Sequence, residues 1–208
     1  MLRPFIHLCV RSTVRLVAHI ESEGAQQLQM PGAFIIASNH LTNWDAPLIY
    51  SQMPFGRPLI PLAADKWRSV LPIRLLFDSI NAVWIKRDEV DREALRTITQ
   101  MLKDGNSVGI APEGTRSKTR QMQPAKPGVA WLARATGVPI IPAAVWGVEN
   151  IAPNLRRLRR TYVHVHFAAP ITLTRNDDVT ASTDHIMRTI AGLLPEEYRG
   201  VYRVTSDD

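Results

Sequence analysis

Short apolar runs alternate with helical patterns along this chain, and no other feature limits its possible folds as strongly. Runs that are apolar throughout are typical of strands buried on both faces, which requires helices on both sides of a sheet. The sequence therefore predicts a three-layer α/β/α domain with a mixed, mostly buried central sheet. Strands are expected near residues 33–38, 58–64, 82–86, 107–111, 138–145 and 161–167.

Helical periodicity fills the intervals between these strands. The clearest helix is expected from Asp88 to Asp104, because acidic residues lie in its first turn and Gly105 follows its end. A length of 208 residues suits one core. We expect an N-terminal amphipathic segment at 1–24, a main domain at 25–200 and a frayed tail at 201–208. The other helices are expected at residues 1–20, 45–53, 66–78, 127–137 and 178–193.

The N-terminal helix has an apolar and a basic side at 100° per residue. Two roles are open: binding flat on an anionic membrane, or packing on the core of the domain. Arg11 and Arg15 interrupt any signal-peptide core, and no apolar run approaches the roughly 20 residues that cross a bilayer. The expected apolar face is Phe5, Ile6, Cys9, Val10, Leu16, Val17 and Ile20, and the expected basic face is Arg3, His7, Arg11, Arg15 and His19.

The net charge of +6 and the pI near 9.9 favour anionic partners. Nucleic acid is not the expected partner, because no zinc-finger spacing, recognition helix or aromatic RNA-binding signature is found. Anionic lipid fits the charge better, and residues 155–160, four arginines around two leucines, either touch headgroups or form a solvated surface. Cys9 is the single cysteine, which excludes an intramolecular disulfide and favours a reducing compartment.

One polar motif follows the apolar run at 33–37 directly. His40 and Asp45 are five residues apart, which is about 140° around a helix and opposite faces of a strand. They meet only if the chain turns between them, and Asn43 with Pro47 favours such a turn. Asp45 would then accept a hydrogen bond from His40 Nδ1 and leave Nε2 free as a base.

A second polar motif follows the apolar run at 108–110 and places Glu113 and Arg116 around Gly114. Between the motifs, Gly105-Asn106-Ser107-Val108-Gly109 matches the G-x-S-x-G pattern of serine hydrolases. We reject this match, because a helix precedes it and a strand follows, the reverse of a nucleophile elbow. Without a protein nucleophile, the base must activate a substrate hydroxyl, which indicates group transfer.

His164 and His166 alternate along an expected strand and so share one face. Two ligands alone make a poor zinc site, since structural zinc takes four. We interpret them as strand-surface residues and expect no metal site.

The two polar motifs together resemble the signatures of the glycerolipid acyltransferases. His40 and Asp45 are similar to the H-x4-D signature of this family, Asn39 to the residue that often precedes it, and residues 113–117 to the E-G-T-R-S signature. The family's G-x-x-F-I-x-R block is matched at Ile85 and Arg87, with Asn81 and Trp84 in place of glycine and phenylalanine. Lys126 with Gly128, and residues 138–142, resemble its K-x-G and V-P-I-I-P blocks.

The resemblance implies an acyltransferase domain over 25–200 that moves a fatty acyl group from a thioester to a lysophospholipid, with 1-acyl-sn-glycerol-3-phosphate as the expected acceptor. His40 and Asp45 would be catalytic. No cofactor is expected, and acyl-CoA or acyl-carrier protein would be the donor. The implied location is cytoplasmic, peripheral on the inner face of the membrane. The implied substrate-binding residues are Asn39, Arg87, Glu113, Gly114, Thr115, Arg116 and Lys126.

Three alternatives stay open on the sequence alone. The altered middle block allows a different lyso-lipid acceptor. The same His40–Asp45 pair would also suit a hydrolase that activates water against a thioester. A catalytically inactive homologue that keeps only a membrane-binding role is the third alternative.

Overall fold

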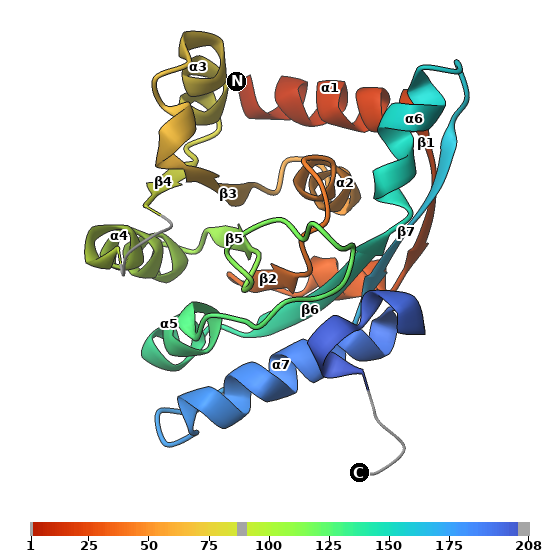
Figure 1. The fold of residues 1–208 in the computed structure, drawn as a ribbon. Helices are drawn as coiled ribbons and strands as arrows, with labels where there is room; N and C mark the ends of the chain where they lie inside the picture. Colours follow the sequence, from red (N-terminus) through yellow and green to blue (C-terminus); the bar gives the residue numbers. More distant parts are fainter. Residues whose placement is uncertain (1, 87–90, 204–208) are drawn as a thin grey trace.

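The computed structural model describes residues 2–86 and 91–203, and in it a seven-stranded sheet is flanked by helices (Figure 1). The strand order is β1-β7-β6-β2-β5-β3-β4. The strands are β1 (Ala18–Glu23), β2 (Ile35–Ser38), β3 (Leu59–Ala64), β4 (Val83–Ile85), β5 (Ser107–Ile110), β6 (Ile140–Trp146) and β7 (Thr161–Phe167). The α-helices are α1 (Leu2–Val17), α2 (Asp45–Gln52), α3 (Leu71–Ser79), α4 (Arg92–Lys103), α5 (Gly128–Thr136), α6 (Ile151–Leu155) and α7 (Val179–Leu193).

All neighbouring strands are parallel except β6 and β7, which are antiparallel, so the sheet is mixed as predicted. In the centre, β2 pairs with β5 through Ile35 opposite Val108, and with β6 through Ile35 opposite Ile140. Because β2 and β5 are parallel, their carboxyl ends meet at one edge of the sheet. The loops that follow these two strands carry the two polar motifs.

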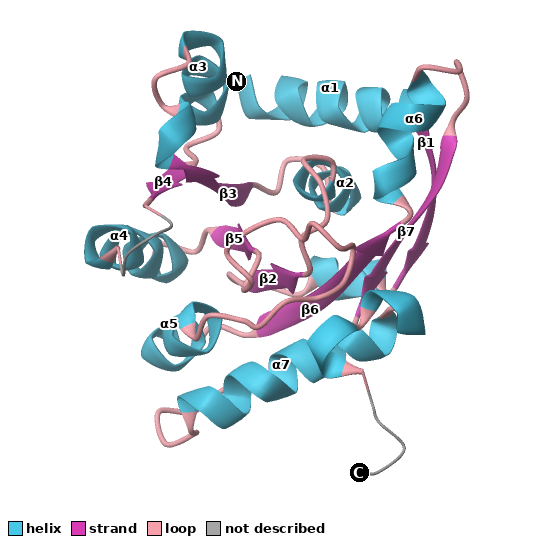
Figure 2. Cartoon of the chain, in the orientation of Figure 1, coloured by secondary structure: helices cyan, strands magenta, loops and turns pink. Residues whose placement is uncertain are grey.

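Helices lie on both sides of the sheet (Figure 2). Each face of the sheet has its own apolar core, as the three-layer prediction requires. Helices α4, α5 and α7 pack on one face, around fully buried residues such as Ile98, Leu132 and Ile190. Helices α1, α2 and α6 contribute Val14, Leu48 and Ile151 to the core on the other face. The central strands lie between these two layers.

The N-terminal helix ends at Val17, three residues earlier than predicted, and residues 18–23 form strand β1. This strand pairs in parallel with β7, with Ala18 opposite Thr161 and Glu23 opposite His166. It lies at the edge of the sheet, where one face can be polar, so it lacks the apolar run that marks the central strands. The segment at 1–24 therefore includes a strand of the main sheet.

The predicted sides of α1 are also wrong in part. His7 is buried against the rings of Tyr50 and Phe55, whereas Phe5 and Leu16 are exposed on the outer side. Burial and a neighbouring Arg11 lower the pKa of His7, so the neutral ring is the form that packs here. Among the residues that the structure describes, no helix combines the length and hydrophobicity needed to cross a bilayer.

Other boundaries differ for local reasons. The helix expected at 66–78 is a 3₁₀ turn, Asp65–Trp67, followed by α3, because Val70 is extended and Pro72 fits only the first turn of a new helix. Helix α4 begins at Arg92 because Asp91 caps it, accepting from Ala94 N at 2.9 Å. The earlier part of the expected helix, 88–90, lies outside the described residues.

The expected frayed tail is wrong for its first residues. Gly200–Tyr202 form a 3₁₀ turn, and the Tyr202 hydroxyl accepts a hydrogen bond from Ala125 N at 3.2 Å. A Cβ on Gly200 would lie 2.2 Å from Met122 O, so the turn packs tightly on the loop after the second motif. Residues 204–208 lie outside the described part of the chain.

Candidate active site

The chain turns between β2 and α2, and this turn brings the His40 ring and the Asp45 carboxylate together. His40 Nδ1 lies 2.7 Å from Asp45 Oδ2. Asp45 is the first residue of α2, where the helix dipole favours a negative charge. Because the carboxylate only accepts, Nδ1 carries the proton in this pair and Nε2 keeps its lone pair.

Asp45 is held by more than the histidine. Its Oδ2 also accepts from the backbone amides of Leu41, at 2.7 Å, and Thr42, at 2.8 Å, and its Oδ1 accepts from the Thr42 hydroxyl at 3.1 Å. The carboxylate is buried, with 2% of the residue exposed. These donors fix the acid in place, so the imidazole has a single orientation.

Glu113 of the second motif lies behind His40 and not beside Arg116. Its Oε1 accepts from the backbone amide of His40 at 3.2 Å, and its Oε2 accepts from the backbone and side-chain amides of Gln123. Burial raises the pKa of Glu113 to about 7, although these hydrogen bonds oppose the shift. Glu113 thus contacts the His40 backbone and Gln123, and it forms no ion pair with Arg116.

The second loop is also fastened to the first at Ser117, whose backbone amide donates to His40 O at 2.8 Å. The two residues before it, Thr115 and Arg116, have exposed side chains. Arg116 has no ion-pair partner among the residues that the structure describes. A free guanidinium beside a fixed base suits an anionic group on a substrate.

Gly114 occupies the left-handed region at φ +71° and faces Lys126. A Cβ at this position would lie 3.3 Å from Lys126 Cε, so the glycine lets the lysine stem pass over the loop. The backbone amide of Lys126 donates to Pro112 O at 2.9 Å, which closes the loop around the motif. Lys126 thus lies next to Gly114 of the E-G-T-R-S residues.

Asn39 is in a different position from the other predicted binding residues. Its amide donates to Val145 O and accepts from Val145 N, both at 2.8 Å, and the residue is 1% exposed. Both ends of this side chain are used to join the end of β2 to β6. The geometry therefore fits a positioning role for His40 better than contact with a substrate. Arg87 lies outside the described residues.

The rejected serine pattern behaves as predicted. Ser107 opens β5, is buried, and accepts from Phe34 N at 3.3 Å. Gly105, at φ +84°, follows helix α4 and donates to Leu102 O, which is the geometry of a helix end. The segment is a helix-to-strand connection and carries no exposed nucleophile.

Two residues of this site were missed. Thr42 binds Asp45 through both its amide and its hydroxyl. A threonine three residues before an acidic residue at a helix start is a pattern from which this contact could have been predicted. Gln123 binds Glu113 from ten residues further along the chain. Nothing in a single sequence indicates that contact, because it depends on how the loop folds back.

Comparisons with known proteins identify the family of the chain. A family model described as Acyltransferase matches residues 19–146, which contain both motifs and well over half of the chain. The chain belongs to the acyltransferase family. The matched residues include every strand of the sheet except β7, and both loops of the site.

Individual relatives in this family differ in how much they share. A protein named 1-acyl-sn-glycerol-3-phosphate acyltransferase from Borreliella burgdorferi is 25% identical over 150 residues, 69% of this chain and 58% of its own length. One of the same name from Escherichia coli is 42% identical over 69 residues, 33% of this chain and 28% of its own. This chain thus spans less than two thirds of each.

A solved structure shows the same acyltransferase fold. It is the 1-acyl-sn-glycerophosphate acyltransferase of Thermotoga maritima, with a TM-score of 0.71 and 21% sequence identity. The likeness covers 90% of this chain and 78% of that one. It confirms the mixed α/β fold, with a central sheet flanked by helices.

Proposed function

We propose that the protein transfers a fatty acyl group from an acyl thioester to the hydroxyl of a lysophospholipid, with 1-acyl-sn-glycerol-3-phosphate as the acceptor and phosphatidic acid as the product. The 2.7 Å contact of His40 Nδ1 with the buried carboxylate of Asp45 carries this proposal. The family membership and the names of the relatives support the choice of reaction.

The proposed reaction uses the arrangement of His40 and Asp45, in which Nδ1 faces the carboxylate and Nε2 has a free lone pair. His40 Nε2 takes the proton of the acceptor hydroxyl as its oxygen attacks the thioester carbonyl carbon. Asp45 stabilises the imidazolium that forms, because its charge is already fixed opposite Nδ1. The tetrahedral intermediate expels the thiolate, which receives the proton from His40, so the products are the new ester and a free thiol. No acyl-enzyme is needed.

Positive charge at the second loop suits the phosphate of the acceptor. Arg116 is exposed next to Ser117, which is bonded to the His40 backbone, so its guanidinium can reach a phosphate with paired hydrogen bonds. Thr115 and Lys126 lie on the same loop or next to it. Arg87 stays a predicted phosphate ligand from the sequence. The donor is an acyl thioester of coenzyme A or of acyl-carrier protein, and no cofactor takes part.

The direct test is the His40→Ala variant in an assay with purified protein, 1-acyl-sn-glycerol-3-phosphate and an acyl thioester. General base catalysis is worth about 10²- to 10⁴-fold, so acyl transfer should fall by that factor. Near-normal transfer would rule the mechanism out.

Two further assays test the alternatives. Thiol release by the wild type without a lysolipid would support the hydrolase alternative instead. Mass spectrometry of the products from a lysolipid panel identifies the acceptor.

We further propose that the protein acts on an anionic membrane surface. The outer side of α1 exposes Phe5, Leu8 and Leu16. The turn after α6, residues 156–160, exposes Leu158 at 94%, with arginines on both sides of it. This turn is tied to the end of α1, since Arg160 donates to Ala18 O at 2.7 Å. Exposed apolar side chains with flanking arginines suit insertion beneath anionic headgroups.

Cosedimentation with vesicles tests this second part. Binding to phosphatidylglycerol vesicles that weakens with salt, and little binding to phosphatidylcholine vesicles, is expected. Equal binding to both would contradict an electrostatic attachment.

A further inference from the structure

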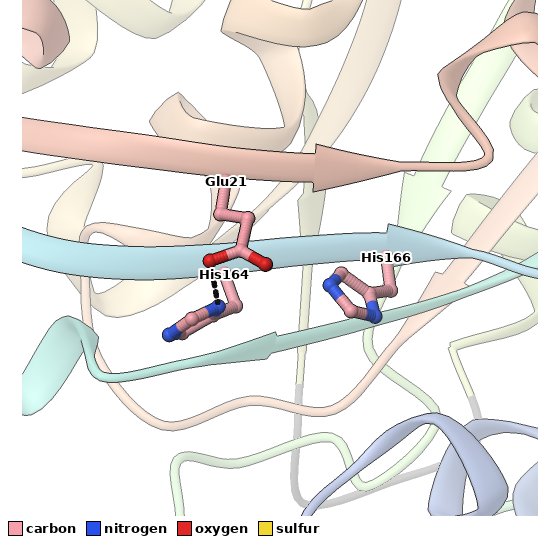
Figure 3. Close-up of side chains that lie close together, drawn as sticks. All are labelled: Glu21, His164 and His166. Carbon is pink, nitrogen blue, oxygen red and sulfur yellow. Dashed lines mark ion pairs between the residues drawn. The ribbon is translucent and has the colours of Figure 1, made fainter.

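Three potential metal ligands, none of them part of the two loops of the candidate active site, meet on one side of strands β1 and β7. Glu21 is the partner of His164 in the strand register, and His166 is two residues further along the same face of β7. Figure 3 shows the carboxylate and both imidazole rings on the same side of the two strands. One ligand atom from each residue lies within 4.8 Å of the other two.

The spacing of these atoms is close to that of a coordination sphere. Ligands about 2.0–2.1 Å from a tetrahedral zinc ion lie about 3.3 Å from one another. His164 Nδ1 and Glu21 Oε2 are 3.3 Å apart already. The ligand atom of His166 lies within 4.8 Å of the ligand atoms of the other two residues. The sequence alone showed two histidines, and the third donor comes from a strand more than 140 residues away.

His166 carries the strongest sign of a missing partner. Its Nε2 is buried and has no hydrogen-bond partner. Its Nδ1 lies 3.5 Å from Glu23 Oε2, so Glu23 can hold a proton on Nδ1 and leave a lone pair on Nε2. Such carboxylate–histidine pairs orient the histidine ligands of metal ions. A buried nitrogen without a partner is costly, and a metal ion would supply the partner.

The indole of Trp146 holds the ring of His164 in place. The indole stacks on His164 with centroids 4.6 Å apart and planes 7° from parallel, and it meets His166 edge-on at the same centroid distance. The two imidazoles are thus positioned before any ion binds, which reduces the entropy lost on binding. An apolar wall on one side of a cluster also strengthens the attraction between its ligands and a cation.

We propose that Glu21, His164 and His166 bind a divalent transition-metal ion, with zinc the best match to two imidazoles and one carboxylate. Three protein ligands leave a fourth position for water. The ion would join the edge strand β1, which directly follows α1, to β7. Its effect is therefore to stabilise the N-terminal part of the fold, and it does not depend on the proposed acyl transfer.

Isothermal titration of chelator-treated protein with Zn²⁺ is the first test. One equivalent should bind to the wild type, and the melting temperature should rise with added Zn²⁺. Co²⁺ in its place should give the visible absorption of a four-coordinate site. Glu21→Gln and His166→Asn should each weaken binding at least tenfold. The Glu21 side chain is 62% exposed, so Glu21→Gln tests the site without endangering the fold.

Two control variants separate this site from other histidines. His185→Asn changes an exposed histidine of α7, and His40→Ala removes the ring beside Asp45. Both should bind Zn²⁺ like the wild type. Failure of the wild type to bind one equivalent, unchanged binding in Glu21→Gln, or loss of binding in His40→Ala would each overturn the proposal.

Discussion

The two loops of the candidate active site are built in opposite ways. Asp45, in the first loop, is buried and accepts hydrogen bonds from two backbone amides, a hydroxyl and the His40 ring. Arg116, in the second loop, is exposed and has no ion-pair partner within the described residues. The difference separates two tasks: proton transfer requires a fixed geometry, whereas capture of a phosphate requires a charge that can move onto its ligand.

The largest effect is expected for Asp45→Asn, which tests the fixed loop. The amide cannot stabilise the imidazolium and can reverse the tautomer of His40, so kcat should fall by roughly 10²- to 10⁴-fold. The free energy of unfolding should fall by about 1–3 kcal/mol, because buried amides lose a charged acceptor. Kinetics and urea unfolding measure both. The control Asp184→Asn, which removes an exposed pair with Arg188, should change neither measurably.

The next effect concerns Glu113 and is seen in the pH dependence of stability. Its pKa is raised in the folded protein, from 4.5 to about 7, so the folded state binds the proton more tightly than the unfolded state. The contribution of Glu113 to the free energy of unfolding is on the order of 3 kcal/mol. It is fully present below pH 4.5 and is lost as the pH rises to 7. Glu113→Gln should remove this slope in urea unfolding between pH 5 and 8. The exposed Glu93→Gln should keep it, and an unchanged slope in Glu113→Gln would contradict the assignment.

Arg116→Ala tests the exposed charge of the second loop. The loss of a charge-assisted contact of about 1.5–3 kcal/mol should raise KM for the phosphate-bearing acceptor by roughly 10- to 100-fold. Stability should change by less than about 0.5 kcal/mol, since the side chain is exposed. Lys118→Ala, an exposed charge two residues away, is the matched control. If Arg116→Ala lowered kcat and stability as Asp45→Asn does, the two loops would not differ in the way described.

The smallest effect is expected at Leu158, which has φ +53° at the tip of the arginine-rich turn. Glycine suits this conformation better, so Leu158→Gly should stabilise the free protein by up to about 1 kcal/mol. It should nevertheless weaken binding to anionic vesicles roughly three- to tenfold, because an apolar contact is lost. Val201→Ser, at an exposed valine of the C-terminal turn, should leave vesicle binding unchanged.

The layered fold could be predicted from the sequence because the central strands are apolar on both faces. Residues 161–167 form a strand with the predicted bounds, and the strands at 33–38 and 107–111 were placed to within two residues. Strand β1 could not be predicted in this way, since an exposed edge strand with Glu21 and Glu23 lacks an apolar run. Tertiary packing also overrode the helical pattern of α1, where two aromatic rings bury His7.

For the site, the sequence predicted that His40 and Asp45 would meet, because their spacing excludes contact within one helix or strand. The contacts of Glu113 could not be predicted in this way, because its partners are not its neighbours in sequence. The His40 backbone and Gln123 become its partners only through the crossing of two loops. Contacts of this kind depend on the parallel pairing of β2 with β5, which no local pattern encodes.

Asn39 substitutes a side chain for a main-chain partner at the end of β2. Its side-chain amide forms two hydrogen bonds with the backbone of Val145. In a longer strand, the backbone of the next residue would form these bonds. The polypeptide can therefore leave the ladder one residue early without stranding a buried polar group of β6. The peptide groups of His40 become available to Glu113 and Ser117, and the reactive ring is held from behind by both loops.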